Sequence, residues 1–428
     1  MKYIKRLLFD EIKKWIGRKE IIAIRGPRQS GKTTLLKILS EWLADDRDID
    51  ENHIIYITFE DRGQLDAFSQ NPNDFMERLV KDKKTHYVLL DEAQYCPDLG
   101  QKLKLVYDLF DNVKLVITGS SSLELKNQTG KYLVGRLLEF DLMPLNFYEY
   151  LNYADEGLAR MYLQWHERVM ALISEGRDFD IKKDPDILAK EMLKHLDTFV
   201  TFGGYPAVVA ADGKDEKEML LRNMLNNYID KDIVSFLQIT DTIKFRKLVT
   251  AIAASDGSMI KMEELATQIG SYFKELSKLI DVLEQTYVIR RISPYHKNLL
   301  TELKKARKTY FVDMGLRNAL IENFSSLENR PDAGVLAENF ILNEIFEHSK
   351  VHFWRTTAKT EVDFVAEGKS LLPIEAKFQH FANAKVNKSL YGFLGEYKPA
   401  EALMITRDFW GERSFKQSKI KFVPICYM

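Results

Sequence analysis

Short apolar runs alternate with segments of helical periodicity through the first third of the chain. The first run, Ile21–Arg25, is rich in β-branched residues and typical of a buried parallel strand. Segments of helical character separate most of the runs, and this alternation predicts an α/β fold with a parallel sheet and helices on both faces. The four later strand-like runs are Ile54–Phe59, Tyr87–Glu92, Lys114–Ser120 and Leu137–Leu142.

The middle of the chain is predicted to be mainly helical. Residues 155–235 mix charged and apolar positions, and the sequence FGGYP at Phe202–Pro206 breaks the helices in a turn that we interpret as structural. Two helices joined by a tight glycine turn follow, which is a helix-turn-helix signature, and two strands then complete a winged helix. These expected elements are Ile243–Ala254, Met262–Gly270, Ser271–Gln285, Tyr287–Ile292 and Thr309–Asp313.

The last quarter of the chain is predicted to mix helix and sheet. A helix is expected at Gly334–His348 and a strand at Val351–Thr356. A hairpin follows, with its turn near Glu367–Ser370. Glu375 and Lys377 lie two positions apart in its second strand, so their side chains share one face of the sheet.

A candidate phosphate-binding loop follows the first strand. Residues 26–34 (GPRQSGKTT) match G-x-x-x-x-G-K-[ST] at every fixed position, and a helical sequence follows. Glycines let backbone N–H groups face phosphate, Lys32 can reach the β- and γ-phosphates of ATP, and Thr33 can ligate Mg²⁺. The alternative, a chance glycine-rich turn, is disfavoured by the strand and helix on either side. The expected nucleotide-binding residues are Gly26, Pro27, Arg28, Gln29, Ser30, Gly31, Lys32, Thr33 and Thr34.

Two adjacent carboxylates end the strand Tyr87–Glu92. Ligands of open α/β sheets bind at the carboxyl ends of the strands, where the phosphate loop also lies. We therefore expect Asp91 to hold Mg²⁺ and Glu92 to polarise the attacking water, although such a pair is often only a solvated strand end. Ser120, after the next strand, could contact the γ-phosphate or belong to an ordinary turn. Arg136 could be an arginine finger for a neighbouring subunit's ATP, or a surface arginine.

Together these segments resemble the AAA+ class of P-loop ATPases. The resemblance rests on GPRQSGKTT, LLDEAQ, ITGSSS and the run VGRLLEFDLMPLNFYEYL. The later segments FGGYP, YFVDMGLRNAL and VDFV…IEAK narrow it to predicted prokaryotic ATPases with a C-terminal domain of uncharacterised function. The resemblance implies binding of ATP and Mg²⁺, and ATP hydrolysis.

The C-terminal hairpin resembles the PD-(D/E)xK nuclease class, with Val362 where a proline often precedes the aspartate. In that resemblance Asp363 and Glu375 hold Mg²⁺, Lys377 activates water or stabilises the developing charge, and Glu338 adds a further metal contact. Hard carboxylate oxygens and a nearby cation suit this chemistry. The alternative is a nuclease-like fold that serves only as an interaction or regulatory module.

A basic segment accompanies the predicted wing. Arg290–Lys308 contains seven basic residues and a single acidic one, Glu302, so it is a candidate contact for the DNA backbone. A merely solvated loop, or a module that binds protein partners, is the alternative. Because the whole chain has a formal net charge of −1, any nucleic-acid site must be a local patch.

Composition points to an intracellular, cytoplasmic protein that does not enter a membrane. There are only two cysteines, no signal-peptide pattern and no apolar run of membrane-spanning length. The eight histidines are scattered without the spacing of a zinc motif, so each is expected to lie at the surface or in the core.

We therefore predict four segments: a P-loop core at residues 1–150, a helical lid at 151–240, a winged helix at 241–324 and a nuclease-like domain at 325–428. The expected function is ATP hydrolysis coupled to action on nucleic acid, and the arginine finger would imply a homo-oligomer. The alternatives are a nucleotide-dependent switch that binds protein partners and an ATP-gated defence effector.

Overall fold

The computed structural model describes residues 3–119, 132–181, 186–228, 241–296 and 306–428. The chain forms two compact units. The first comprises Met1–Pro144 with the short stretch Gln285–Val288, and the second comprises Leu145–Glu284 with Ile289–Met428.

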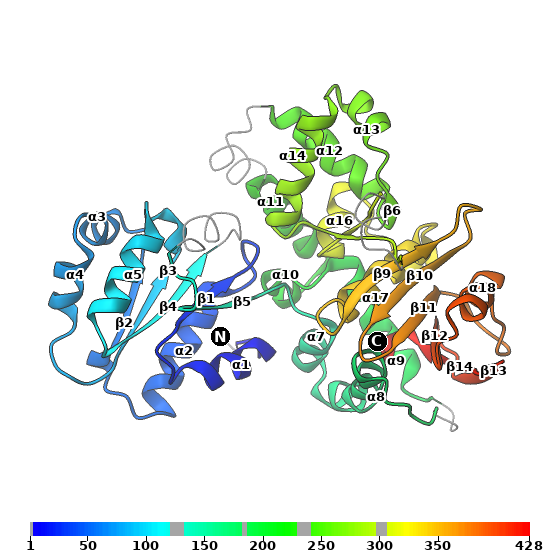
Figure 1. Cartoon of the computed structure of the whole chain (residues 1–428), viewed down its shortest axis with the longest axis horizontal. Coiled ribbons are helices and arrows are strands. Elements are labelled where there is room, and N and C mark those ends of the chain that lie inside the picture. The colour runs from blue at the N-terminus through cyan, green and yellow to red at the C-terminus, as the bar shows by residue number, and fades with distance from the viewer. Residues whose placement is uncertain (1–2, 120–131, 182–185, 229–240, 297–305) are drawn as a thin grey trace. The chain divides into compact units, whose positions relative to one another are not determined.

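The first unit is built on a parallel sheet, as the sequence predicted. Its five strands have the order β2-β3-β4-β1-β5, and all four neighbouring pairs are parallel (Figure 1). The strands are β1 (Ile21–Arg25), β2 (Ile54–Thr58), β3 (His86–Asp91), β4 (Val113–Gly119) and β5 (Leu137–Asp141). β3 and β4 are buried throughout, which explains why both read as continuous apolar runs.

Helices cover both faces of this sheet. Alternate side chains of the strands enter two separate cores, one shared with α1 and α2 and the other with α3, α4 and α5. The helices are α1 (Leu7–Trp15), α2 (Lys32–Asp45), α3 (Arg62–Gln70), α4 (Pro72–Leu79) and α5 (Leu99–Leu109), with short 3-10 turns η1 (Glu51–His53) and η2 (Ala93–Tyr95). The α/β fold class is thereby confirmed.

The second unit begins with helices. They are α7 (Phe147–Ala154), α8 (Glu156–Glu175), α9 (Ala189–Phe202), α10 (Pro206–Ala210) and α11 (Lys214–Asn227). The apolar faces of α7, α8 and α9 enter one hydrophobic core together with the C-terminal sheet. The segment that the sequence assigned to a lid therefore buries its apolar side chains against that sheet.

Three helices and a small antiparallel sheet form the middle of the second unit. The helices are α12 (Thr242–Ala254), α13 (Met262–Ile269) and α14 (Phe273–Gln285), and the sheet has the order β6-β8-β7 with β6 (Ser258–Met259), β7 (Ile289–Ile292) and β8 (Lys308–Phe311). Gly270 ends α13 with a φ of 69°, the left-handed conformation that favours glycine at a helix end. The predicted helices and strands are present, and β6 is an additional strand. α16 (Met314–Leu320) and η4 (Leu327–Asn329) then lead to the last part of the chain.

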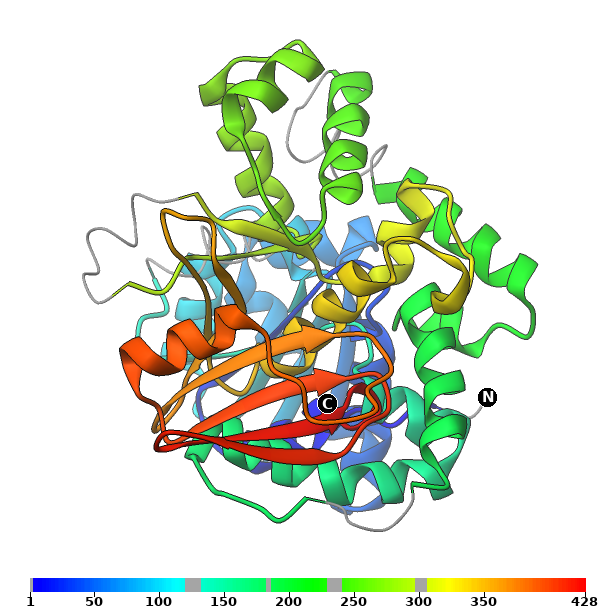
Figure 2. The same cartoon turned by 90° about the vertical axis from the view of Figure 1, so that its right-hand side faces the viewer.

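The C-terminal part is a six-stranded mixed sheet between two layers of helices. Its order is β13-β14-β12-β11-β10-β9, and its strands lie side by side in orange to red in Figure 2. α17 packs on one face and α18 on the other. The elements are α17 (Ala333–Ile345), β9 (Lys350–Arg355), β10 (Glu361–Glu367), β11 (Leu371–Lys377), α18 (Lys388–Tyr397), β12 (Glu401–Thr406), β13 (Gly411–Phe415), β14 (Ser418–Pro424) and η5 (Ile425–Tyr427).

Candidate functional site

The loop between β1 and α2 has a backbone that only glycine can adopt at two positions. Gly26 has a φ of 152°, and a Cβ there would overlap the carbonyl oxygen of Leu142. Gly31 has a φ of 100° and precedes the first residue of α2. Both fixed glycines of the motif are thus required by geometry, and the loop delivers the chain to a helix N-terminus, where anions are stabilised.

Lys32 lies inside the curve of this loop. Its Nζ donates hydrogen bonds to the carbonyl oxygens of Gly26 at 3.0 Å and Pro27 at 2.8 Å, and the residue is buried. Ser30 is also buried, and its Oγ has no hydrogen-bond partner among the residues described. The other predicted loop residues lie in the same loop or in the first turn of α2: Arg28, Gln29 and Thr34.

Asp91 is the point at which the polar groups of the P-loop unit converge. Its Oδ2 accepts hydrogen bonds from Thr33 Oγ1 at 2.8 Å and from the hydroxyl of Tyr56 at 2.7 Å. Its Oδ1 accepts from the hydroxyl of Thr118 and, at 3.2 Å, from the backbone N–H of Glu92. The structure therefore brings Thr33 and Asp91 together, which is the pairing that a magnesium site in a P-loop protein needs.

Glu92 directly follows this buried carboxylate in a left-handed conformation, with a φ of 53°. Its backbone N–H also donates to Thr118 Oγ1 at 3.1 Å, and its side chain accepts from Gln94. Burial is the main cause that raises the pKa of Tyr56 well above its ordinary value, and the hydrogen bond to Asp91 adds to it. The phenol therefore stays protonated and donates its hydrogen bond to Asp91. Tyr56 and Gln94 were not among the residues predicted for this site. Ser120 lies outside the described residues.

The side chain of Arg136 contacts residues of the P-loop unit, to which Arg136 itself belongs. Its guanidinium contacts the carboxylate of Asp108 at 3.2 Å and lies over the ring of Tyr107, 5.6 Å from the centroid. Both partners belong to α5, and the side chain of Arg136 is about a third exposed, at 34%. An arginine finger at this position would first have to release these contacts, so the role remains a prediction.

The C-terminal hairpin brings together three of its four predicted residues. Phe364 pairs with Ile374 across β10 and β11, which places Asp363 beside Glu375. Lys377 Nζ lies 2.7 Å from Glu375 Oε1 and 3.8 Å from Asp363 Oδ2. One cation and two carboxylates therefore share a small space on one face of the sheet.

The carboxylates of this cluster are deeply buried. Glu375 Oε1 also accepts a hydrogen bond from Asn387 Nδ2, whereas its Oε2 is buried with no partner among the described residues. Burial, with Glu338 and Glu375 nearby, holds the pKa of Asp363 well above its usual range, and burial likewise raises the pKa of Glu375. Such carboxylates require a proton or a cation to relieve the cost of ionisation.

Glu338 has different partners. It accepts hydrogen bonds from Tyr310 and, at 3.0 Å, from Lys308 Nζ, and Lys308 also contacts Glu361 at 2.6 Å. Burial alone would lower the pKa of Lys308, but the nearby acids Glu338, Glu361 and Asp363 raise it to about 12, so it stays charged. Arg355 also contacts Glu361, at 3.2 Å. The cluster therefore contains four acids against three basic residues, an excess of one negative charge when all are ionised. These residues are Glu338, Glu361, Asp363, Glu375, Lys308, Lys377 and Arg355.

Much of the basic segment near the wing is used internally. Arg290 contacts Glu347 at 3.0 Å, Arg291 contacts Asp281 at 2.7 Å, and Lys308 is paired as described. Arg307 is exposed. The remaining lysines, 297, 304 and 305, lie outside the described residues. The excess of basic residues in the sequence therefore overstates the charge that this segment offers to DNA.

The two motifs that identify the later part of the chain are packed against each other. Gly203 has a φ of 76°, and a Cβ there would overlap the carboxylate of Asp313. Asp313 accepts hydrogen bonds from the backbone N–H groups of Gly204 at 2.7 Å and Leu316 at 2.8 Å. A Cβ at Gly315 would in turn overlap the carbonyl of Phe202. FGGYP and YFVDMG therefore pack tightly against each other, and we call this contact the Gly203–Asp313 contact.

Comparison with known families agrees with this geometry. Residues 18–151 match the model of an AAA domain family, so the first unit carries an AAA-type P-loop domain. Residues 193–327 match a domain of unknown function, DUF8612, and residues 333–428 match another, DUF4143.

Two curated relatives span most of this chain. An uncharacterized protein of Methanocaldococcus jannaschii is 25% identical over 368 residues, covering 83% of this chain and 74% of the relative. An uncharacterized protein of Haemophilus influenzae is 24% identical over 420 residues, covering 95% and 93%. Among solved structures, the Aeropyrum pernix ORC1 protein in complex with DNA matches with a TM-score of 0.32 and 13% identity, covering 74% of this chain and 91% of that one. Among the residues described here, no helix is both long and apolar enough to cross a membrane.

Proposed function

We propose that this chain is a Mg²⁺-dependent ATPase whose hydrolysis cycle controls a C-terminal site that acts on nucleic acid. The observation that carries the ATPase part is the convergence of Lys32, Thr33 and Asp91 at the carboxyl edge of the sheet. Within the AAA-type domain, this arrangement has the parts that phosphoryl transfer needs: a cradle for phosphate, a cation and a carboxylate.

Each residue has a distinct task in this proposal. Lys32 would exchange its two carbonyl acceptors for phosphate oxygens, and Thr33 and Asp91 would hold a Mg²⁺ ion that would supply positive charge to offset that of the phosphates. Glu92 orients the attacking water and accepts its proton. Gln94 holds the carboxylate of Glu92 and so positions it.

The ATPase proposal is tested by two substitutions with different expected effects. ATP and Mg²⁺ at about a hundred times the dissociation constant should stabilise the wild-type chain by roughly 2.7 kcal/mol. Lys32→Ala should remove most of this stabilisation, measured as the shift in melting temperature. Glu92→Gln should keep the shift and release phosphate far more slowly.

The ligand-free Lys32→Ala protein is the necessary baseline, because the substitution also removes two hydrogen bonds within the loop. A full ATP-dependent shift in Lys32→Ala would refute the assignment of the loop. Hydrolysis at the wild-type rate in Glu92→Gln would remove Glu92 from the catalytic role.

For the C-terminal site we propose nuclease-like binding of one divalent cation. Its support is the buried Glu375 Oε2, which has no partner among the described residues, and the excess of one negative charge in the cluster. Asp363 and Glu375 would be the ligands, and Lys377 would stabilise negative charge on an attacked phosphate. A regulatory switch or a defence effector with an inactive site is the competing function.

The test uses Mn²⁺ titration of the full chain, followed by cleavage assays on single- and double-stranded DNA and RNA with and without ATP. Asp363→Asn and Glu375→Gln should each abolish one saturable Mn²⁺ site, while Asp408→Asn, at an exposed pair in the same unit, should leave it unchanged. Mn²⁺ binding without cleavage under every nucleotide condition would favour the switch. No binding at all would refute the metal site.

A further inference from the structure

A second cluster of metal-ligand types lies at the opposite edge of the P-loop sheet. His53 ends η1 and directly precedes β2, and His86 is the first residue of β3. Because β2 and β3 are parallel neighbours with Ile54 opposite Tyr87, both histidines enter the sheet side by side. Asp91 is the last residue of the same strand β3, about 17 Å away at the rise of an extended chain.

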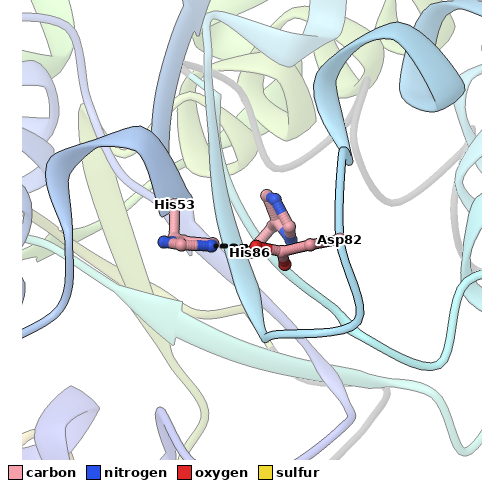
Figure 3. Close-up of side chains that lie close together, drawn as sticks. All are labelled: His53, Asp82 and His86. Carbon is pink, nitrogen blue, oxygen red and sulfur yellow. Dashed lines mark hydrogen bonds and ion pairs between the residues drawn. The ribbon is translucent and has the colours of Figure 1, made fainter.

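Asp82, in the loop before β3, completes the cluster (Figure 3). One ligand atom from each of His53, Asp82 and His86 lies within 4.8 Å of the others. His53 Nε2 is 2.9 Å from Asp82 Oδ2, and the two imidazole rings are 4.7 Å apart. Both histidines are buried, whereas the side chain of Asp82 is 46% exposed, so the cluster has one side open to water.

The loop that presents these groups is held by its own hydrogen bonds. His86 Nδ1 lies 2.9 Å from the carbonyl oxygen of Lys84, which can only accept, so Nδ1 is the donor and the neutral ring presents the lone pair of Nε2. Asn112 Nδ2 donates to the carbonyls of Asp82 at 2.8 Å and Lys84 at 3.1 Å. A histidine anchored to a backbone carbonyl, in a pinned loop, is the usual support of a metal-binding imidazole.

We propose that His53, Asp82 and His86 bind a divalent transition-metal ion of the zinc class. Two imidazoles and one carboxylate favour such an ion over Mg²⁺, which prefers oxygen ligands. Bond lengths of about 2.0–2.2 Å place ligand atoms roughly 3.4 Å apart, so ligand atoms that are now up to 4.8 Å apart approach by up to about 1.4 Å on binding. Water completes the coordination on the side of Asp82. The ion would fasten the loop before β3 to η1, at a site separate from that of ATP.

The cluster also has a simpler explanation, a hydrogen bond between His53 and Asp82 with no ion. Titration calorimetry of Zn²⁺ into the chelator-treated full chain separates the two. The metal site requires one Zn²⁺ per chain, binding that excess Mg²⁺ does not displace, and a rise in melting temperature without ATP. His53→Gln and Asp82→Asn should each weaken binding at least about tenfold, as expected for the loss of a ligand.

His380→Gln is the matched control, because His380 contacts Asp408 at 2.9 Å in an exposed pair outside the cluster. It should leave Zn²⁺ affinity unchanged. Circular dichroism of His53→Gln checks that the variant is folded. Absence of Zn²⁺ binding by the wild-type chain, or undiminished binding by folded His53→Gln, would overturn the proposal. ATP binding is independent of either result, so failure here leaves the ATPase proposal standing.

Discussion

Glu344 should make the second unit less stable as the pH rises. This glutamate on α17 is buried and accepts a hydrogen bond at 3.1 Å from the backbone N–H of Phe147, the first residue of α7. Burial raises the pKa of Glu344 to about 8. The hydrogen bond from Phe147 acts in the opposite direction, and the nearby negative charge of Glu149 raises the pKa further. The protonated side chain is therefore the form that the folded chain prefers.

The size of the effect follows from the two pKa values. Below about pH 4.3 the carboxyl is protonated in both the folded and the unfolded chain. Between there and about pH 8 only the folded chain holds the proton, so the free energy of unfolding falls by about 1.4 kcal/mol per pH unit. The total contribution of Glu344 is roughly 5 kcal/mol, all of it present at low pH and lost above pH 8.

Glu344→Gln should abolish this contribution, because its amide carries no charge and its oxygen still accepts from Phe147. Urea unfolding followed by tryptophan fluorescence between pH 5 and pH 9 is the assay, and Trp165 and Trp410 report on the same core. The variant should gain stability over the wild type as the pH rises.

Two other buried acids, Asp256 with a pKa of about 7 and Asp313 with a pKa of about 6, titrate in the same range but cancel in the difference between variant and wild type. Glu263→Gln, at an exposed position on α13, is the control and should follow the wild type. The same pH slope in Glu344→Gln and the wild type would refute the reasoning.

Two further predictions concern the Gly203–Asp313 contact and the basic segment Arg290–Lys308. Gly203→Ala should lower the stability of the second unit by several kcal/mol, because it combines backbone strain with overlap of the new Cβ on Asp313. Gly334→Ala in α17 is the control: a Cβ there meets no other atom, so this change should raise the stability by up to about 1 kcal/mol in the same melting experiment. If DNA binds through the basic segment, neutralisation of about five phosphates gives a log–log salt slope near −4 to −5. Arg307→Ser should then reduce the slope by about one and Arg291→Ser should not, because Arg291 is already paired; equal effects would contradict the pairing.

The P-loop unit could be predicted well because its signals are local. The strand at Ile21–Arg25 has the bounds that the sequence indicated, and the last strand differs only at its end, Leu137–Asp141. Strands buried on both faces are short apolar runs, and the residues that bind nucleotide follow them directly. Thr33 and Asp91 lie at the same carboxyl edge of the sheet, and the structure brings them into contact although β4 lies between β1 and β3.

Contacts between distant residues could not be predicted in this way. The sequence made Arg290 a candidate contact for DNA, whereas in the structure its guanidinium donates hydrogen bonds to Asn343 and Glu347. Similarly, no sequence pattern linked Asn387 to Glu375, or Tyr56 to Asp91. A polar residue inside an apolar strand was the only signal that could have indicated Tyr56.

The histidines show the same limit. Metal-binding motifs that can be identified from spacing along the chain lie on one helix or one loop, and none of the eight histidines has such spacing. His53 and His86 instead precede two parallel strands, and neighbouring parallel strands bring their entry points together whatever the length of chain between them. Once strand order is known, polar residues at both edges of a sheet merit comparison, not only those at the carboxyl edge.

The two carboxylate sites differ in the source of the charge that neutralises them. Asp91 accepts hydrogen bonds from neutral hydroxyl groups, and in our proposal the bound Mg²⁺ would supply the positive charge. The C-terminal acids already have Lys377 from their own hairpin and Lys308 from β8, in the middle segment. Withdrawal of Lys308 would raise the excess negative charge from one to two, which would favour a metal ion at the neighbouring carboxylates of Asp363 and Glu375. In our proposal the middle segment therefore has an electrostatic route to the C-terminal site, through Glu338 and Glu361, which Lys308 contacts.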